Sequence, residues 1–195
     1  TGVEIDSNVI SIGENAFYNA FRLTSITIPA SVESIGLSAF NGAMSLTSII
    51  IPASVESIGQ LAFANTYDIT EIIVSLSNTH YKDISGVLFN SNQENLIQYP
   101  FGNTRTIYEI PDSVITIEED AFQGASYLTS ITIPSGVTSI GTNASFQIQS
   151  LTNITVGSNN KNYKDISGVL FDSSGATLIQ SPINYPTTSY EIPAS

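Results

Sequence analysis

The chain contains no cysteine, and it has one histidine and five lysine or arginine residues among its 195 positions. The absence of cysteine excludes disulfides, thiol nucleophiles and cysteine-ligated metal sites. The single histidine, His80, excludes a zinc site built from several histidines, although a Ser-His-Asp site would need only one. No glycine-rich phosphate loop and no paired-carboxylate motif occurs. We therefore expect no cofactor, no metal site and no catalytic residue.

Positive charge is scarce, because 17 acidic residues give a formal net charge of −12. Nucleic acids and anionic membranes both require clustered cations, and none cluster here. No apolar run approaches the ~18 residues of a membrane span, and no signal segment opens the chain. Nucleic acid and membrane are thus excluded as expected partners. Because 42% of the residues are hydrophobic, the chain can still bury a core.

An internal repeat dominates the sequence. Residues 28–36 (IPASVESIG) recur at 51–59 with the same letters, a spacing of 23 residues. Further copies begin at Ile5, Ile110, Ile133 and Val156. The unit can be written I-P-x-x-V-x-x-I-G-x-x-A-F-x-x-A-x-x-L-T-x-I-x. A fixed period of this length predicts a solenoid of stacked coils rather than a globular domain.

A second, 36-residue unit alternates with the first, and it carries the segment YKDISGVLF at both 81–89 and 163–171. We predict a single solenoid domain over residues 1–195. The 23-residue repeats lie at about 5–73 and 110–155, and the 36-residue repeats lie at 74–109 and 156–191. Both ends fall inside a unit, so we expect further repeats or other domains beside this segment.

Local patterns predict the shape of one coil. The alternation of Ile26, Thr27 and Ile28 indicates a strand that ends at Pro29, and a second short extended segment closes at Gly36. Residues 39–43 (AFNGA) favour one helical turn. In the long unit, residues 87–89 and 96–98 flank a polar turn, which predicts a β-hairpin that projects from the coil or widens it.

One coil cannot bury its own large apolar side chains, but stacked parallel coils can, at about 4.8 Å per coil. We expect one phenylalanine per coil to form an internal stack, rather than an aromatic platform for a ligand. These residues are Phe17, Phe40, Phe63, Phe122 and Phe146. An extra residue at 144–146 predicts a local bulge.

The repeat resembles the BspA-like leucine-rich repeat, a family found in surface and secreted proteins, and the longer unit resembles one that these proteins often carry. The family often has cysteine where this chain has Ala20, Ala43, Thr66, Ala125 and Ile148. Small apolar residues can fill that core position. The resemblance implies a right-handed β/α superhelix with parallel strands on one face and short helical turns. It also implies adhesion and binding to host proteins, outside the cell or at its surface, and supplies no catalytic residues.

Outward strand positions form rows that we predict to be a flat, concave binding face. The candidate residues are Thr24, Ser25, Thr27, Thr47, Ser48, Ile50, Thr70, Glu71, Ile73, Thr129, Ser130, Thr132, Thr152, Asn153 and Thr155. The alternative is that serine and threonine only suit a solvated sheet. Ile50, Glu71 and Ile73 break the hydroxyl pattern, which makes them the best candidates for a contact patch. Regular threonine rows also suggest ice binding, but Glu71 and the long units interrupt them.

Aromatic residues concentrate in the long units, where they either contact a ligand or pack the hairpin onto its neighbour. They are Tyr81, Phe89, Tyr99, Phe101, Tyr108, Tyr163, Phe171, Tyr185 and Tyr190. His80 is expected to be a solvated loop residue. Residues 172–175 (DSSG) are too short and too weakly charged for a calcium loop. Asn143 and Asn153 begin glycosylation sequons, which only a eukaryotic secretory route would use.

Two functions follow as hypotheses. The first is a non-catalytic cell-surface or secreted module that binds a protein or glycan through its sheet and its long units. The second is a rigid spacer that presents other domains. A binding face should carry unlike residues at equivalent outward positions, whereas a spacer should be monotonous.

Overall fold

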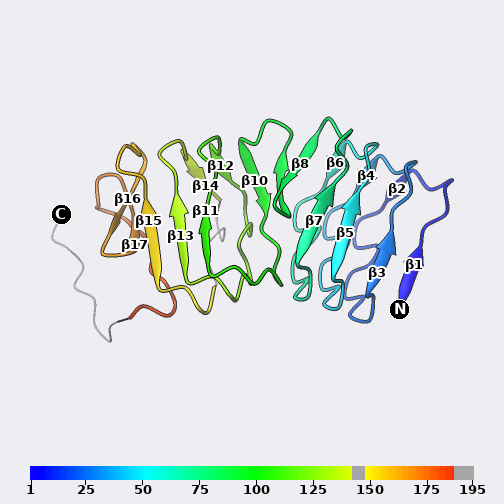
Figure 1. Cartoon of the computed structure of the whole chain (residues 1–195), viewed down its shortest axis with the longest axis horizontal. Helices are drawn as coiled ribbons and strands as arrows, with labels where there is room; N and C mark the ends of the chain where they lie inside the picture. Colours follow the sequence, from blue (N-terminus) through cyan, green and yellow to red (C-terminus); the bar gives the residue numbers. More distant parts are fainter. Residues whose placement is uncertain (142–147, 187–195) are drawn as a thin grey trace.

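The computed structural model describes residues 1–141 and 148–186, which form an elongated stack of coils (Figure 1). We number the coils one to seven from the N-terminus. They span residues 2–23, 24–46, 47–69, 70–105, 106–128, 129–151 and 152–186, so coils four and seven are the long ones. Each coil contributes its first strand to one face of the stack, the long-strand face, and coils one to six contribute a later strand to a second face, the short-strand face.

The long-strand face is built from parallel strands of successive coils. They are β1 (Gly2–Glu4), β3 (Ser25–Thr27), β5 (Ser48–Ile51), β7 (Glu71–Val74), β11 (Ile107–Glu109), β13 (Ser130–Ile133) and β15 (Asn153–Val156). Equivalent residues pair, as Val3 does with Ile26 and Ile131 with Ile154. This register keeps each β-branched residue directly above its counterpart and confirms the predicted solenoid of parallel strands.

The short-strand face holds two-residue strands that also pair in parallel. They are β2 (Ser11–Ile12), β4 (Ser34–Ile35), β6 (Ser57–Ile58), β12 (Thr116–Ile117) and β14 (Ser139–Ile140). Their isoleucines turn inward, since Ile12, Ile35 and Ile117 are buried. The long coil four joins this face through β10 (Asn95–Gln98), which pairs in parallel with β12.

The helical turn expected after each short strand is not confirmed, because the described residues contain no helix. The segment has two left-handed residues four positions apart, such as Ser38 (φ 53°) and Gly42 (φ 78°) in coil two. A right-handed helix cannot contain them. Their coil-three counterparts, Leu61 and Asn65, have the same sign. The segment is instead a series of tight turns whose alternate amides bond to the next coil, as when the amide of Phe40 donates to the carbonyl of Ala62 at 2.8 Å. The right-handed superhelical sense stays a prediction.

The predicted hairpins are confirmed, and each gains a third strand. In coil four, β8 (Tyr81–Ile84), β9 (Val87–Asn90) and β10 run antiparallel in sequence order. Coil seven repeats them as β16 (Tyr163–Ile166), β17 (Val169–Asp172) and β18 (Leu178–Gln180). The outward projection that we considered does not occur at β9, because Val87, Leu88 and Phe89 are fully buried. Leu88 packs with the N-terminal coils and its two neighbours pack with the C-terminal coils, so β9 separates two core clusters.

Polar side chains of coil four make hydrogen bonds to backbone groups of coil three and of β7, at the place where coil four departs from the short repeat. The amide nitrogen of Asn78 donates to the carbonyls of Pro52 (2.8 Å) and Val55 (3.0 Å), and Asn160 repeats this pattern with Pro134 and Val137. The hydroxyl of Tyr81 accepts from the amide of Ile58 at 2.8 Å. Asp83 accepts from the amide of Val74 at 2.9 Å. These contacts supply partners that a regular next strand would otherwise provide.

The phenylalanine stack is confirmed in coils one to three. The rings of Phe17 and Phe40 lie 5.2 Å apart, and those of Phe40 and Phe63 lie 5.8 Å apart, both nearly parallel. In coil four Tyr99 takes the same position and stacks on Phe122 at 5.4 Å. Phe146 and the predicted bulge at 144–146 lie outside the described residues. The sites where the family often has cysteine are filled as expected, since Ala43, Thr66, Ala125 and Ile148 are fully buried.

Truncation of one stacked ring should destabilise the solenoid. Phe40→Ala removes a side chain that is completely buried between two other rings, and we expect it to lower the free energy of unfolding by about 3–5 kcal/mol. Phe21→Ala is the control, because Phe21 is 59% exposed; it should change stability by no more than about 0.5 kcal/mol. Urea unfolding of both variants measures the difference, and equal losses would contradict the stack.

Two tyrosines of coils four and five are buried deeply enough to resist ionisation. Burial raises the pKa of Tyr99 to about 12, because the phenolate would lose its hydration, and Arg105 offsets part of that cost. The hydroxyl of Tyr99 donates to Asn103 at 3.1 Å. Burial and the neighbouring Tyr99 also raise the pKa of Tyr108 well above the ordinary value. Tyr108 takes the inward strand position that isoleucine holds elsewhere, and its hydroxyl has no partner within the described chain.

The solenoid should therefore lose stability at alkaline pH. Unfolded tyrosine ionises near pH 10, whereas folded Tyr99 remains protonated up to about 12. The stabilisation is complete below pH 10 and is lost as pH rises from 10 through 12. Thermal melts across this range measure it, and Tyr99→Phe should reduce the slope. An unchanged slope in Tyr99→Phe would mean that other groups cause the loss.

Candidate functional site

The predicted binding residues lie on the long-strand face, on the outward side of the strands or just before them. In coils two to four, Thr24, Thr47, Thr70, Ser25 and Glu71 are exposed. Ser48, Ile73, Thr129, Ser130, Thr132, Thr152 and Asn153 are half-buried, and Thr27, Ile50 and Thr155 are exposed. All three rows run along the stack from coil to coil.

The first threonine row is used by the solenoid itself. The hydroxyls of Thr129 and Thr152 donate to the carbonyls of Thr106 and Thr129 at 3.0 and 2.9 Å. Thr70 makes the same bond to Thr47 at 3.3 Å. These hydroxyls extend the inter-coil ladder beyond the strands, which supports the structural explanation for this row rather than a binding role.

Sequence reasoning missed three members of the outward rows, because the 36-residue unit interrupts the 23-residue spacing from which the rows are counted. Ile107 pairs with Ser130 and Glu109 with Thr132, so both belong to the outward rows, and Thr106 continues the threonine row. Counting back from the Ile110-Pro111 anchor would have found them. Ile107 is 61% exposed, although it is a large apolar side chain.

The unlike residues gather on the middle of the long-strand face. We call Ile50, Glu71, Ile73, Ile107 and Glu109 the central patch. Ile50 pairs with Ile73 across β5 and β7, and Ile50 is 59% exposed. The patch therefore combines exposed aliphatic surface with two carboxylates.

The turn of the first hairpin separates the two halves of the central patch. The carbonyl of Gly86 accepts from the amide of Ile72 at 2.9 Å, and a side chain at Gly86 (φ 82°) would collide with Glu71. On the other side, the guanidinium of Arg105 donates to the carbonyl of Ser85 at 3.0 Å. The turn thus lies between β7 and the residues that precede β11, and it bonds to both sides.

A second apolar row lies at the corner that precedes each long strand. Phe21, Met44 and Tyr67 occupy equivalent positions in coils one to three, with 59%, 42% and 51% of their surface exposed. The guanidinium of Arg22 lies 5.8 Å from the centre of the Phe21 ring. Tyr67 packs edge-on against Phe101 of coil four at 5.8 Å. We call this the corner row; no sequence pattern marked it, because it lies outside the strands.

The long-unit aromatics pack inward rather than outward. Tyr99, Phe89, Phe101 and Phe171 are buried, and Tyr81 and Tyr163 cap backbone amides of the preceding coils. Tyr185 donates its hydroxyl to the carbonyl of Ser167 at 2.8 Å. Tyr190 lies outside the described residues. Packing of the hairpin is thus the explanation that the structure supports.

The titratable side chains were candidates for a metal site or a reactive site. There, no group of three or more His, Asp or Glu side chains is arranged to hold a metal ion. His80 is exposed, and its ring nitrogen lies 3.3 Å from the hydroxyl of Thr79. Hydrogen bonds from Ser174 and the amides of Thr177 and Gly175 lower the pKa of Asp172, so its carboxylate serves the turn. The amide of Asn153 donates to Thr155, while Asn143 lies outside the described residues.

No helix in the described residues is long and apolar enough to cross a membrane.

Comparison with known proteins assigns the chain to a family. A family model described as the BspA type leucine rich repeat region, in 6 copies, matches residues 1–108 and 95–191. A leucine rich cell surface protein from Faecalibacterium prausnitzii is similar in structure, with a TM-score of 0.75 and 33% identity over 83% of this chain. The pneumococcal vaccine antigen PcpA is similar in fold alone, with a TM-score of 0.54 and 18% identity over 83% of this chain.

The chain spans 42% of the length of the Faecalibacterium protein and 63% of PcpA. No curated protein matches the chain in sequence. The family model covers nearly all of the chain, and the structure has the parallel-strand solenoid of leucine-rich repeat proteins. The chain therefore belongs to the BspA-type leucine-rich repeat family.

Proposed function

We propose that this chain is a non-catalytic binding module of a cell-surface or secreted protein, and that it binds a protein or glycan through the central patch. The observation that carries the proposal is the exposure of Ile50, Glu71 and Ile107 on the long-strand face, whose outward rows consist mainly of serine and threonine. Exposed apolar side chains bordered by polar ones are typical of interaction surfaces. The similarity to a leucine rich cell surface protein supports the extracellular setting.

The composition of the surface favours a protein or glycan over other partners. Only five cations occur in the chain, so a polyanionic partner would be repelled. The surrounding hydroxyls of Ser48, Ser130 and Thr132 offer donors and acceptors of the kind that glycans and peptide backbones accept. The corner row of coils one to three offers a second apolar surface, which would extend the contact around the edge of the stack.

The alternative is a rigid spacer that presents other domains of a larger protein. The inter-coil hydrogen bonds and the buried ring stack would stiffen the array for that role. A spacer would not require Ile50 and Ile107 to be exposed, and this observation favours binding.

Binding should depend on the central patch and not on the rest of the face. The chain is screened against a glycan array and a displayed peptide library, and ligands so found are titrated by calorimetry. Ile50→Ser with Glu71→Lys should weaken binding at least tenfold, because it removes the apolar contact and reverses one charge. The melting temperature should stay within about 2 °C, since both side chains are exposed.

The matched control is Thr27→Ser with Ser25→Lys, which changes the equivalent outward positions in coil two. It should leave affinity unchanged. If neither screen yields a ligand, or if both double variants bind as the original chain does, the binding proposal fails and the spacer function remains.

A further inference from the structure

Coil four takes a shorter path than coils two and five between the short-strand face and the core aromatic. Phe40 follows the strand residue Ile35 by five positions, and Phe122 follows Ile117 by five, whereas Tyr99 follows Leu96 by three. Both ends of this segment keep the register, because Leu96 pairs with Ile117 and the amide of Tyr99 donates to the carbonyl of Ala121 at 2.7 Å. Coil four therefore lacks two residues of the turn segment.

The missing residues also remove the usual backbone conformation. Coils one, two, three and five each have two left-handed residues here, four positions apart, for example Leu61 with Asn65 and Asp120 with Gly124. Between Gln93 and Asp120 no residue of the chain has a positive φ. The chain cuts across the corner, so coil three and coil five face each other over a gap.

Backbone groups on the wall of this gap lose their partners. In coil two the amides of Ser38 and Phe40 donate to the carbonyls of Gln60 and Ala62 in the next coil. The equivalent amides in coil three belong to Leu61 and Phe63, and within the described residues they donate no hydrogen bond. Across the gap the carbonyl of Glu119, which is equivalent to that of Gln60, accepts none from a described residue.

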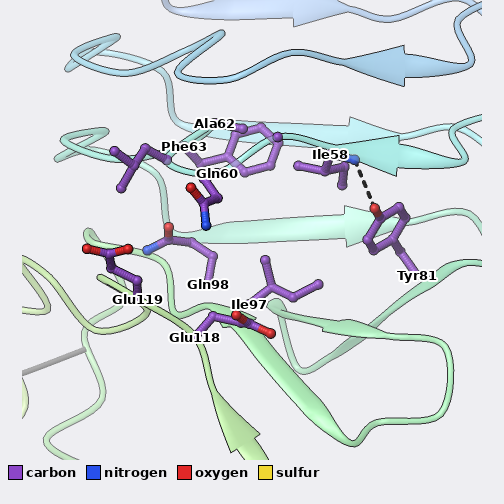
Figure 2. Close-up of a pocket in the computed structure, with 11 residues that line it drawn as sticks. Ile58, Gln60, Ala62, Phe63, Tyr81, Ile97, Gln98, Glu118 and Glu119 are labelled. Atoms are coloured by element: carbon purple, nitrogen blue, oxygen red, sulfur yellow. Dashed lines mark hydrogen bonds between the residues drawn. The ribbon is translucent and has the colours of Figure 1, made fainter. Parts of the chain in front are cut away.

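The gap contains a cavity of about 230 Å³. Figure 2 shows Gln60 and Phe63 on the upper wall and Gln98, Glu118 and Glu119 on the lower wall. Apolar side chains of Ile58, Leu61 and Ile97 complete the lining. No lysine or arginine is among the lining residues, so two carboxylates stand in the cavity wall without a cation among the lining side chains.

The unpaired amides, the unpaired carbonyl and the two carboxylates of the cavity wall each complement a different group of a possible ligand. In an extended peptide, carbonyls two residues apart point to the same side, as do the free amides of Leu61 and Phe63, which are two residues apart. A peptide amide would in turn donate to the carbonyl of Glu119. The carboxylate of Glu118 already accepts from Asn95 at 2.7 Å, which fixes its position, and Glu119 is exposed at the rim. A basic side chain would complement both charges.

We propose that this gap binds a short extended peptide segment with a lysine or arginine side chain, which takes the place of the two residues that coil four lacks. The peptide carbonyls accept from the amides of Leu61 and Phe63, and its basic side chain lies between Glu118 and Glu119. The site is distinct from the central patch and goes beyond the function proposed above.

The test uses the full 195-residue chain and two-dimensional ¹⁵N NMR. Acetyl-Ala-Lys-Ala-amide is the probe, and acetyl-Ala-Glu-Ala-amide is its matched control. We expect the lysine peptide to shift the amide resonances of Leu61 and Phe63 saturably, with a Kd of about 1 mM or below. The glutamate peptide should bind about tenfold more weakly, because it places a like charge beside Glu118 and Glu119.

Variants separate the site from general charge attraction. Glu119→Lys should weaken the lysine peptide about tenfold, whereas Glu14→Lys should not, since Glu14 occupies the equivalent position in coil one and does not line the cavity. Glu119→Gln serves if the lysine substitution lowers the melting temperature. The proposal is overturned if the two amides do not shift, if both peptides bind equally, or if Glu14→Lys weakens binding as much. Ile50→Ser with Glu71→Lys should bind the lysine peptide normally, which keeps this test independent of the central patch.

Discussion

The coils of this solenoid depend on one another for the pairing of their backbone amides and carbonyls. The strands bond to equivalent strands, and the tight turns bond through alternate amides such as that of Phe40. Side chains gain the same regularity, because a fixed register places ring on ring and isoleucine on isoleucine. No coil could bury its apolar side chains alone, so the unit of stability is a pair of neighbours rather than a single repeat.

The long coil interrupts this pairing, and some of its side chains replace the backbone hydrogen-bond partners that are lost. Asn78 and Tyr81 supply side-chain partners to the backbone of coil three, and Asp83 supplies one to Val74 of its own coil. Asn160, Tyr163 and Asp165 repeat these bonds in coil seven. Strand β9 fills the interior with Leu88 toward the N-terminal coils and with Val87 and Phe89 toward the C-terminal coils. The compensation is incomplete at the turn segment, where Leu61 and Phe63 face a cavity. The place of greatest irregularity in the stack is thus also the place with unused hydrogen-bonding groups.

Much of the fold could be predicted from the sequence, because a 23-residue period fixes which residues stack. The Phe17–Phe40–Phe63 stack and the parallel strands follow from it. The turn segment could not be predicted in the same way. Apolar spacing at residues 39–43 suits a helix, whereas Ser38 is left-handed and its amide donates to Gln60 of the next coil, a contact that local spacing does not reveal. The long unit hid Ile107 and Glu109 because its insertion breaks the count. Tyr99 was missed as a stack member because it stands where phenylalanine is usual. The exposed central patch was found only in part.

Coils four and seven share the same hairpin and the same capping side chains, and this similarity has a consequence for the length of the array. Tyr81 and Tyr163 are 82 residues apart, and the chain around each is nearly the same. Removing residues 75–156 would join Val74 directly to Gly157, so that β7 would be followed by the turn and hairpin that now follow β15. Every remaining strand would lie beside a strand equivalent to its present neighbour. The molecule can therefore be shortened or extended by whole 82-residue cassettes, a modularity in which reach changes while the architecture of each layer does not.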